Sequence, residues 1–419
     1  MIRSALVLLA LSAVPQGERP PNIVVIFADD LGYGDLSCFG SKTIRTPNLD
    51  RLASEGARLT QFYSCAPNCT PSRGGLLTGR YPIRTGLVRV LFPKDKVGID
   101  PEEITLAEAL KARGYATGMV GKWHLGCMPE HLPTKHGFDS YLGIPYSNDM
   151  KPTPLYRNDE VLEEPAVQPT LTKRYTEEAV RFVKSAKDKP FFLYFAHTFP
   201  HVPLHVSDEF KGKSKAGLYG DVVEELDWSV GEVAKAIKDA GADRNTFVFF
   251  TSDNGPWLVK KEHGGSAGPL RDGKGTPYEG GVREPAIAWF PGKIPAGRVV
   301  TDPGITLDLF PTCVALADGK LPADRPYDGK NIWPVLSGTG TAGEREFVIY
   351  HNGELRSLRS GKWKYLRSVG KFPEQLYDLE ADTAESKNLL ESEPETAKRL
   401  AARIQEIHAD NLKGARPKK

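Results

Sequence analysis

Cys69 has neighbours that could make it reactive. The surrounding segment, NCTPSRGGLLTGR at residues 68–80, places Arg73 four positions after the cysteine. A short helix is predicted to begin at about Ser72, so Cys69 would lie at its amino end, where the helix dipole and exposed N–H groups favour an anion. This position predicts a lowered thiol pKa, and the simplest chemistry would be that of a thiolate nucleophile.

The spacing of the arginine argues against one class of thiolate enzyme. The cysteine phosphatase loop needs an arginine six residues after the cysteine, and position 75 is Gly. A buried structural cysteine is the other interpretation of an isolated Cys. The five cysteines of the chain are odd in number and scattered, which is typical neither of a disulfide framework nor of a CxxC zinc site.

Four mostly apolar runs, at residues 22–30, 116–126, 191–201 and 246–255, each have polar residues at their carboxyl end. In chain order these polar residues are Asp29 and Asp30, Lys122 and His124, His197 and His201, and Asp253 and Asn254. The Asp and Asn side chains offer only hard oxygen ligands, which suit Ca²⁺ or Mg²⁺, whereas zinc normally recruits His or Cys. Two aspartates after a single strand are more often a cap or a turn, but four such endings together predict a site for a hard divalent cation.

The elements that must position these residues follow from the apolar pattern. Each run is typical of a strand buried on both faces, and residues 46–57, 105–114, 175–186 and 219–241 carry apolar residues at helical spacing. Strands that alternate with helices predict an α/β domain with a mostly parallel central sheet flanked by helices. Ligands of such sheets bind outside the carboxyl ends of the strands, where the polar residues would meet.

Three sequence blocks resemble the type I sulfatase family. C-T-P-S-R at residues 69–73, followed by a glycine and LLTGR, is similar to the first family signature, in which a Cys or Ser is oxidised to formylglycine. GKWHLG at residues 121–126 looks like the second signature, and PLRDGKGTPYEGGVREP at residues 269–285 looks like a further block. LGIPYSNDM looks like the arylsulfatase A branch, with Asn148 where that branch can carry a histidine. The resemblance implies an alkaline-phosphatase-like fold.

The resemblance also implies a mechanism for hydrolysis of sulfate monoesters. As a formylglycine hydrate, residue 69 would offer two hydroxyls, one of which attacks sulfur and forms a covalent sulfate ester. The second, deprotonated by His124, would expel sulfate and regenerate the aldehyde. His201 is the implied general acid for the leaving alcohol, and His197 is the less favoured choice.

The remaining implied roles concern charge. Sulfate would be bound by Arg73, Lys122 and Lys274, and Arg73 could also anchor the aldehyde hydrate. Ser147 would contact the substrate or its sulfate. The resemblance implies Ca²⁺ or Mg²⁺ held by Asp29, Asp30, Cys69, Asp253 and Asn254, and a formylglycine-generating enzyme as partner during maturation.

The carboxyl-terminal part has a different pattern. A Gly- and Thr-rich stretch at residues 337–346 precedes alternating segments that contain Asn352-Gly353, a strong hairpin signal, and residues 394–412 form an amphipathic helical pattern. We therefore expect a signal peptide at 1–17, a catalytic α/β domain at 18–340, and at 341–419 a carboxyl-terminal subdomain with a small antiparallel sheet and one helix.

Charge and the amino-terminal pattern limit the setting. The 55 Lys and Arg residues nearly balance 53 Asp and Glu residues without long runs of either sign, which argues against general binding to nucleic acid or membranes. Arg3 before an apolar run and a polar segment after it predicts an export signal, hence a periplasmic or secreted protein without a membrane span.

The predicted activity is hydrolysis of sulfated carbohydrates or aryl sulfates. Two alternatives remain open: a phosphomonoester or phosphonate hydrolase of the same superfold, and a catalytically silent calcium-bound binding protein. The first would turn over phosphate esters faster than sulfate esters, and in the second Cys69 would stay a thiol.

Overall fold

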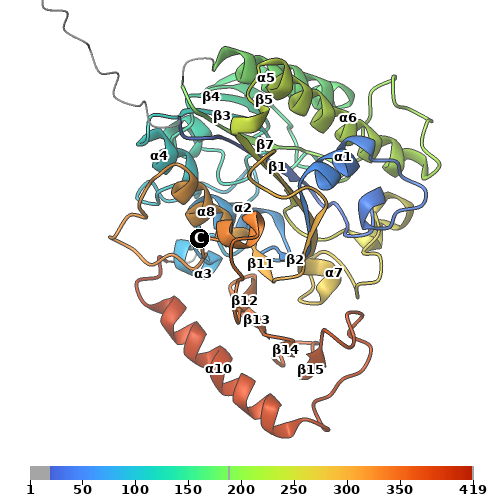
Figure 1. Cartoon of the computed structure of the whole chain (residues 1–419), viewed down its shortest axis with the longest axis vertical. Coiled ribbons are helices and arrows are strands. Elements are labelled where there is room, and N and C mark those ends of the chain that lie inside the picture. Colours follow the sequence, from blue (N-terminus) through green and yellow to red (C-terminus); the bar gives the residue numbers. More distant parts are fainter. Residues whose placement is uncertain (1–18, 187–188, 418–419) are drawn as a thin grey trace, which may run out of the picture.

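The four long apolar runs form the middle of the large sheet. They are β1 (Asn22–Ala28), β3 (Ala116–Gly121), β7 (Phe191–Ala196) and β8 (Thr246–Ser252). Figure 1 labels three of these strands, β1, β3 and β7. The computed structural model describes residues 19–186 and 189–417, so the predicted signal peptide lies outside the described residues. Every residue of β1, β7 and β8 is buried, which explains why these strands read as continuous apolar runs.

The strands of the large sheet follow the order β10-β2-β9-β8-β1-β7-β3-β4-β5-β6, with β11 beside β2. Neighbours from β8 through β1, β7 and β3 to β4 are parallel, whereas β9 runs antiparallel to both β8 and β2. The other strands are β2 (Ala57–Tyr63), β4 (Ser140–Gly143), β5 (Leu155–Arg157), β6 (Glu160–Glu163), β9 (Arg283–Trp289), β10 (Arg298–Val300) and β11 (Gly304–Ile305). The mostly parallel centre confirms the predicted fold class.

Helices cover both faces of this sheet. Side chains of β1 alternate between two buried clusters, with Val24 and Ile26 on one face and Ile23 and Val25 on the other. The first face packs against α1 (Pro47–Glu55), α5 (Leu171–Ser185) and α6 (Gly217–Asp239). The second packs against α2 (Cys69–Thr78), α4 (Leu106–Lys111), α8 (Leu309–Leu316) and α9 (Trp333–Ser337). The predicted helices at residues 46–57, 105–114, 175–186 and 219–241 are confirmed.

Short helices complete the part of the chain that forms the large sheet. They are α3 (Pro82–Thr85) and α7 (Glu279–Val282), with the 3-10 helices η1 (Ser37–Phe39), η2 (Pro129–His131), η3 (Pro133–Lys135), η4 (Gln168–Thr170), η5 (Asp243–Asn245), η6 (Leu258–His263) and η7 (Thr306–Asp308). Among the described residues, no helix is long and apolar enough to cross a bilayer.

The carboxyl-terminal residues form a second, four-stranded antiparallel sheet in the order β12-β13-β14-β15. Its strands are β12 (Glu346–His351), β13 (Glu354–Ser360), β14 (Trp363–Leu366) and β15 (Gln375–Asp378), and α10 (Pro394–Leu412) packs on it (Figure 1). The predicted hairpin turn is present, because Asn352 and Gly353 both have positive φ, at 52° and 76°. Two such residues in succession are what a type I′ turn requires.

The start of α2 differs from its prediction. The helix begins at Cys69 rather than near Ser72, with extended Asn68 (φ −155°, ψ 159°) as its N-cap. Pro71 therefore lies in the first turn, where its missing N–H has no intrahelical partner to lose. Cys69 consequently belongs to the first turn of the helix.

Candidate active site

The four strand endings meet at one edge of the large sheet. Ala28 pairs with Ser252, and Ala196 pairs with both Phe27 and Gly121, so the residues that follow these strands leave the sheet at the same level. The side chains gathered there are almost completely buried: Asp29, Asp30, Lys122, His124, His201, Asp253 and Asn254. Edge position alone thus brings together charges that are far apart in the sequence.

Helix α2 carries Cys69 to the middle of this group. The Cys69 sulfur lies 3.7 Å from Asp29 Oδ1 and 3.6 Å from Lys274 Nζ. Every residue of α2 is buried, and a Cβ on Gly75 would lie 2.3 Å from the Cys65 sulfur. Gly75 is therefore needed for the close packing of the helix that carries Cys69.

The predicted lowering of the Cys69 pKa is wrong. Burial raises the pKa of this thiol to about 12, although Lys122 and Lys274 act in the opposite direction. The position at a helix start gives a favourable dipole, but removal of a thiolate from water costs more in this site. Unmodified Cys69 is therefore a protonated thiol at neutral pH, which argues against the thiolate mechanism.

Three cations pair with three carboxylates, and Arg73 also lies 3.4 Å from Asp29 Oδ1. Lys122 Nζ lies 2.6 Å from Asp29 Oδ2, and Lys274 Nζ lies 2.7 Å from Asp30 Oδ1. The third pair joins Arg73 to Asp253 at 2.8 Å, and the same guanidinium donates to the Lys122 carbonyl at 3.0 Å. Opposite charges alternate across the site, so an anion and a cation can both be bound there without isolated buried charge.

The acidic side chains also fit a hard cation. Asn254 Nδ2 donates to Asp30 Oδ1 at 2.7 Å, whereas the buried Asn254 Oδ1 has no hydrogen-bond donor among the described residues. Ligand atoms of Asp29, Cys69 and Asp253 lie within 4.8 Å of one another, as do those of Asp30, Cys69 and His201. An acceptor without a donor, beside several carboxylates, has the chemistry of a Ca²⁺ or Mg²⁺ ligand set.

His201 and Ser147 lie at the same edge. His201 Nε2 is 3.7 Å from Asp30 Oδ2, and Ser147 Oγ is 3.5 Å from the imidazole. Lys122 Nζ also donates to Ser147 Oγ at 3.2 Å. Burial, with further contributions from Lys274 and Lys122, lowers the pKa of His201 well below its usual range. The imidazole is thus neutral unless a bound anion offsets these cations.

The other two histidines have different surroundings. His124 Nε2 lies 2.8 Å from the Leu91 carbonyl, and burial together with Lys122 lowers its pKa well below the usual value, so the ring is neutral. The His197 ring packs on Phe195 at a centroid distance of 4.2 Å, and burial lowers its pKa to about 3. Of the two histidines after β7, His201 is the one placed among the charged side chains.

Two neighbours of the site were not assigned a role from the sequence. Asn148 Oδ1 lies 3.1 Å from His201 Nδ1, and the Asn148 amide group donates to Gln168 Oε1 and to the Pro203 carbonyl. The centre of the Trp257 ring lies 4.6 Å from Lys274 Nζ and 5.5 Å from the His201 ring. The sequence signal that could have placed Trp257 in the site is its position directly after Asp-Asn-Gly-Pro.

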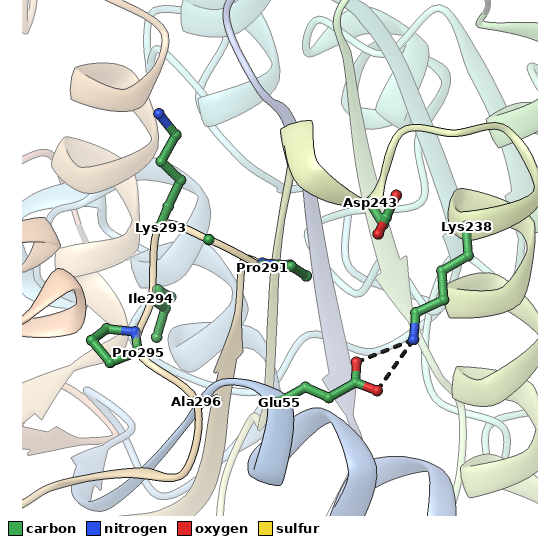
Figure 2. Close-up of a pocket in the computed structure, with 9 residues that line it drawn as sticks. Glu55, Lys238, Asp243, Pro291, Lys293, Ile294, Pro295 and Ala296 are labelled. Atoms are coloured by element: carbon green, nitrogen blue, oxygen red, sulfur yellow. Dashed lines mark hydrogen bonds and ion pairs between the residues drawn. The ribbon is translucent and has the colours of Figure 1, made fainter.

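A separate pocket lies at the opposite edge of the sheet. Its volume is about 510 Å³, and its lining residues include Lys238 and Glu55, which form an ion pair at 3.1 Å. Figure 2 draws the residues that line it. Asp243 precedes β8, and Pro291 follows β9, whose Trp289 pairs with Val248 near the start of β8. The pocket therefore opens at the amino ends of the parallel strands, away from Cys69.

Comparison with known proteins identifies the family. The Sulfatase family model matches residues 21–319, and the chain belongs to this family. It is 43% identical to human arylsulfatase A, over 91% of this chain and 86% of the relative. It is also 43% identical to N-acetylgalactosamine-6-sulfatase of Canis lupus familiaris, over 85% of this chain and 74% of the relative.

A solved structure extends the likeness. The structure of Ps i-CgsB in complex with k-i-k-neocarrahexaose is similar with a TM-score of 0.85 at 33% identity, over 96% of this chain and 95% of the other. The named relatives are sulfuric ester hydrolases, and the present chain is accordingly an enzyme of that class.

Proposed function

We propose that this enzyme hydrolyses sulfate monoesters of carbohydrates through a formylglycine formed from Cys69, with Ca²⁺ or Mg²⁺ bound beside it. The observation that carries the proposal is the position of Cys69. Its sulfur lies at the start of a buried helix, 3.7 Å from Asp29 Oδ1 and 3.6 Å from Lys274 Nζ, within the sequence C-T-P-S-R. A protonated, buried thiol is a poor nucleophile, whereas an aldehyde hydrate at this position would offer two hydroxyls.

The cation would be held by Asp29, Asp30, Asp253, Asn254 and residue 69. When bound, it would supply positive charge that stabilises oxygen anions next to residue 69. The Asn254 oxygen without a donor supports this assignment.

Sulfate would be bound by the side chains that carry positive charge or a hydroxyl. Lys122 and Lys274 pair with Asp29 and Asp30, and both can donate to sulfate oxygens. Ser147, which accepts from Lys122, would donate a further hydrogen bond. Arg73 is paired with Asp253 and with the Lys122 carbonyl, so we assign it to holding these groups and the aldehyde hydrate in place.

Two histidines would move protons in opposite directions. One hydroxyl of the hydrate, already deprotonated and with its negative charge stabilised by the cation that the site would hold, would attack sulfur. The bond from sulfur to the ester oxygen would break as that oxygen takes a proton from His201 Nε2. His124, neutral because of burial and of Lys122, would accept the proton of the second hydroxyl as sulfate leaves and the aldehyde returns.

The substrate class rests on the relatives. N-acetylgalactosamine-6-sulfatase carries a sugar sulfate in its name, and Ps i-CgsB was solved with a neocarrahexaose. We infer a sulfated carbohydrate for this chain, with aryl sulfates as small substrates. We also propose export after cleavage of residues 1–17, maturation by a formylglycine-generating enzyme, and a division into catalytic residues 18–340 and a carboxyl-terminal subdomain at 341–419.

Mass spectrometry of the tryptic peptide spanning residues 59–73 tests the proposal. In protein from a host with the modifying enzyme, residue 69 should be lighter than cysteine, while Cys65 in the same peptide stays unmodified. Cys69→Ala should eliminate hydrolysis of p-nitrophenyl sulfate and retain the fold by circular dichroism. Full activity of wholly unmodified protein would contradict the mechanism.

Two further outcomes separate the alternatives. A higher kcat/KM for p-nitrophenyl phosphate than for the sulfate would favour a phosphohydrolase. A persistent thiol in the native host, without turnover of either ester, would favour a binding protein.

A further inference from the structure

Trp257 joins two candidate catalytic residues to an exposed lysine. Its indole ring is partly buried and lies 4.6 Å from Lys274 Nζ and 5.5 Å from the His201 ring, measured to the ring centre. Lys260 Nζ lies 4.2 Å from the same centre. Lys260 belongs to η6, which begins four residues after Asn254, and its side chain is exposed to solvent.

The shared ring limits the separation of the two ammonium groups. Both nitrogens lie within 4.6 Å of one centre, so they are no farther apart than twice that distance. A cation over an indole face is stabilised by the electron density of the ring, which gives Lys260 a preferred position rather than a free one. Lys260 is thereby held in the neighbourhood of Lys274, and it is the more exposed of the two lysines.

Among the described residues, the positive charge of Lys260 is not paired with a carboxylate, unlike the charges of the more deeply buried cations. Lys122, Lys274 and Arg73 each lie within 3 Å of a carboxylate oxygen. For Lys260, the described part of the chain supplies no carboxylate within ion-pair distance, and its recorded side-chain partner is the Trp257 ring. Two ammonium groups near one another repel, and an anion between or beside them removes that repulsion.

We propose that Lys260 binds a second anionic group of the substrate, next to the sulfate that is cleaved, and that Trp257 positions Lys260 for this contact. The substrate class is then a glycan that carries a further sulfate or a carboxylate close to the scissile ester. Lys260 is a specificity-determining residue, because it contacts a group that takes no part in bond breaking. This inference rests on the proposed sulfate-ester site around Lys274.

The structure also explains why the contact with Lys260 would discriminate between substrates and not only attract any anion. An exposed lysine loses affinity for anions in salt, but the ring and the short η6 segment restrict the geometry in which Lys260 can reach a ligand. A singly charged ester would use the deep cations and leave Lys260 in water. A doubly charged ester would use both, and its binding should improve by about five- to tenfold.

Competition against p-nitrophenyl sulfate tests the proposal. The probes are N-acetylglucosamine 6-O-sulfate and glucosamine 2-N,6-O-disulfate, which share the ring and the 6-sulfate and differ in whether the nitrogen carries a neutral acetyl group or a sulfate. For the wild-type enzyme, the inhibition constant of the monosulfate should exceed that of the disulfate about five- to tenfold. Lys260→Ala should bring this ratio close to one, Lys260→Arg should retain most of it, and added NaCl should lower it in the wild type.

The matched control is Lys398→Ala, which removes an exposed lysine from α10 and should leave the ratio at its wild-type value. Trp257→Ala should also lower the ratio, since Lys260 loses its position. A wild-type ratio near one, or a ratio that Lys260→Ala leaves unchanged, would overturn the proposal.

Failure of the proposed function is recognisable separately. If protein with an aldehyde at residue 69 does not turn over p-nitrophenyl sulfate, the hydrolytic assignment fails. Calorimetric titration of the same two sugars into Cys69→Ala protein then still measures the preference for the second charge and its dependence on Lys260.

Discussion

The imidazole of His201 has neighbours that determine which ring nitrogen can carry a transferable proton. Its Nδ1 lies 3.1 Å from Asn148 Oδ1 and 2.5 Å from the Val202 carbonyl, and both of these atoms accept hydrogen bonds. Nδ1 therefore bears the fixed proton, and Nε2, on the side of Asp30, is the nitrogen that gains and loses the other. A bound sulfate ester would oppose Lys274 and Lys122 and so favour the protonated ring.

Replacement of His201 by Ala should affect substrates according to their leaving groups. Alkyl and sugar sulfates, whose alcohols leave poorly without a proton, should lose about 10²-fold or more in kcat. p-Nitrophenyl sulfate should lose much less, because its phenolate leaves without protonation. The measurement is kcat for a series of leaving groups, with His197→Ala as the matched variant. Equal losses across the series would move the acid role to another residue.

Asn254 is a second residue whose role can be tested by itself. Its Oδ1 is buried without a donor, so Asn254→Ala removes a proposed ligand but leaves the carboxylates in place. We expect Ca²⁺ or Mg²⁺ affinity to fall about 10- to 100-fold, as is common when a metal site loses a contact. Calorimetric titration of metal-free protein with Ca²⁺ measures this directly. Wild-type affinity in the variant would remove Asn254 from the ligand set.

Among the elements, the long buried strands were predictable and the shorter, mixed ones were not. β1, β7 and β8 are apolar along their whole length, and that pattern has few other interpretations. β2 alternates buried and partly exposed residues, and β9 follows a glycine-rich segment, so neither has a comparable run. The strand endings could therefore be placed at one edge, while the antiparallel side of the sheet required the structure.

The elements around Cys69 show a second limit of sequence reasoning. The helix start gave the correct region for Cys69, but the direction of its pKa depends on burial by parts of the chain far away in sequence. Lys122, Lys274, Asp253 and Asp29, which act on this pKa together with burial, come from four other segments of the chain. Trp257 was missed for the same reason, because only the fold brings η6 against His201 and Lys274.

At the scale of the whole molecule, a buried cluster of charges joins the two sheets. Lys364 of β14 lies 2.9 Å from Glu279 Oε1 in α7 and 2.9 Å from Glu385 Oε1. Glu385 Oε2 also accepts the Glu279 N–H at 2.6 Å, and Tyr63 donates to Glu279 Oε2. Because α7 begins five residues after Lys274, this cluster ties the carboxyl-terminal sheet to the loop that carries a proposed sulfate ligand.

The two carboxyls of the cluster titrate in different ranges. Burial would raise the pKa of Glu279, but Lys364 and Arg283 outweigh it and lower the pKa to about 2. Burial raises the pKa of Glu385 to about 7, and the nearby charge of Glu279 adds to this effect. One lysine thus faces one carboxylate and one carboxylic acid at mildly acid pH. Above pH 7, a second buried negative charge appears between the sheets.

This difference predicts how the variant Glu385→Gln depends on pH. Between the unfolded value of about 4.5 and the folded value of about 7, the folded wild type binds a proton that the unfolded chain has released, so stability from this group falls as pH rises. Glutamine cannot ionise, so the melting temperature of Glu385→Gln relative to wild type should rise by roughly 3 °C between pH 5.5 and pH 8.

Thermal unfolding of both proteins at saturating Ca²⁺ measures this difference in melting temperature. Because the two proteins share all other titrating groups, the effects of those groups cancel in the difference. The exposed Glu391→Gln should show a constant difference from wild type over the same range. Parallel pH curves for wild type and Glu385→Gln would mean that Glu385 is ionised throughout, with Lys364 compensating both carboxylates at once.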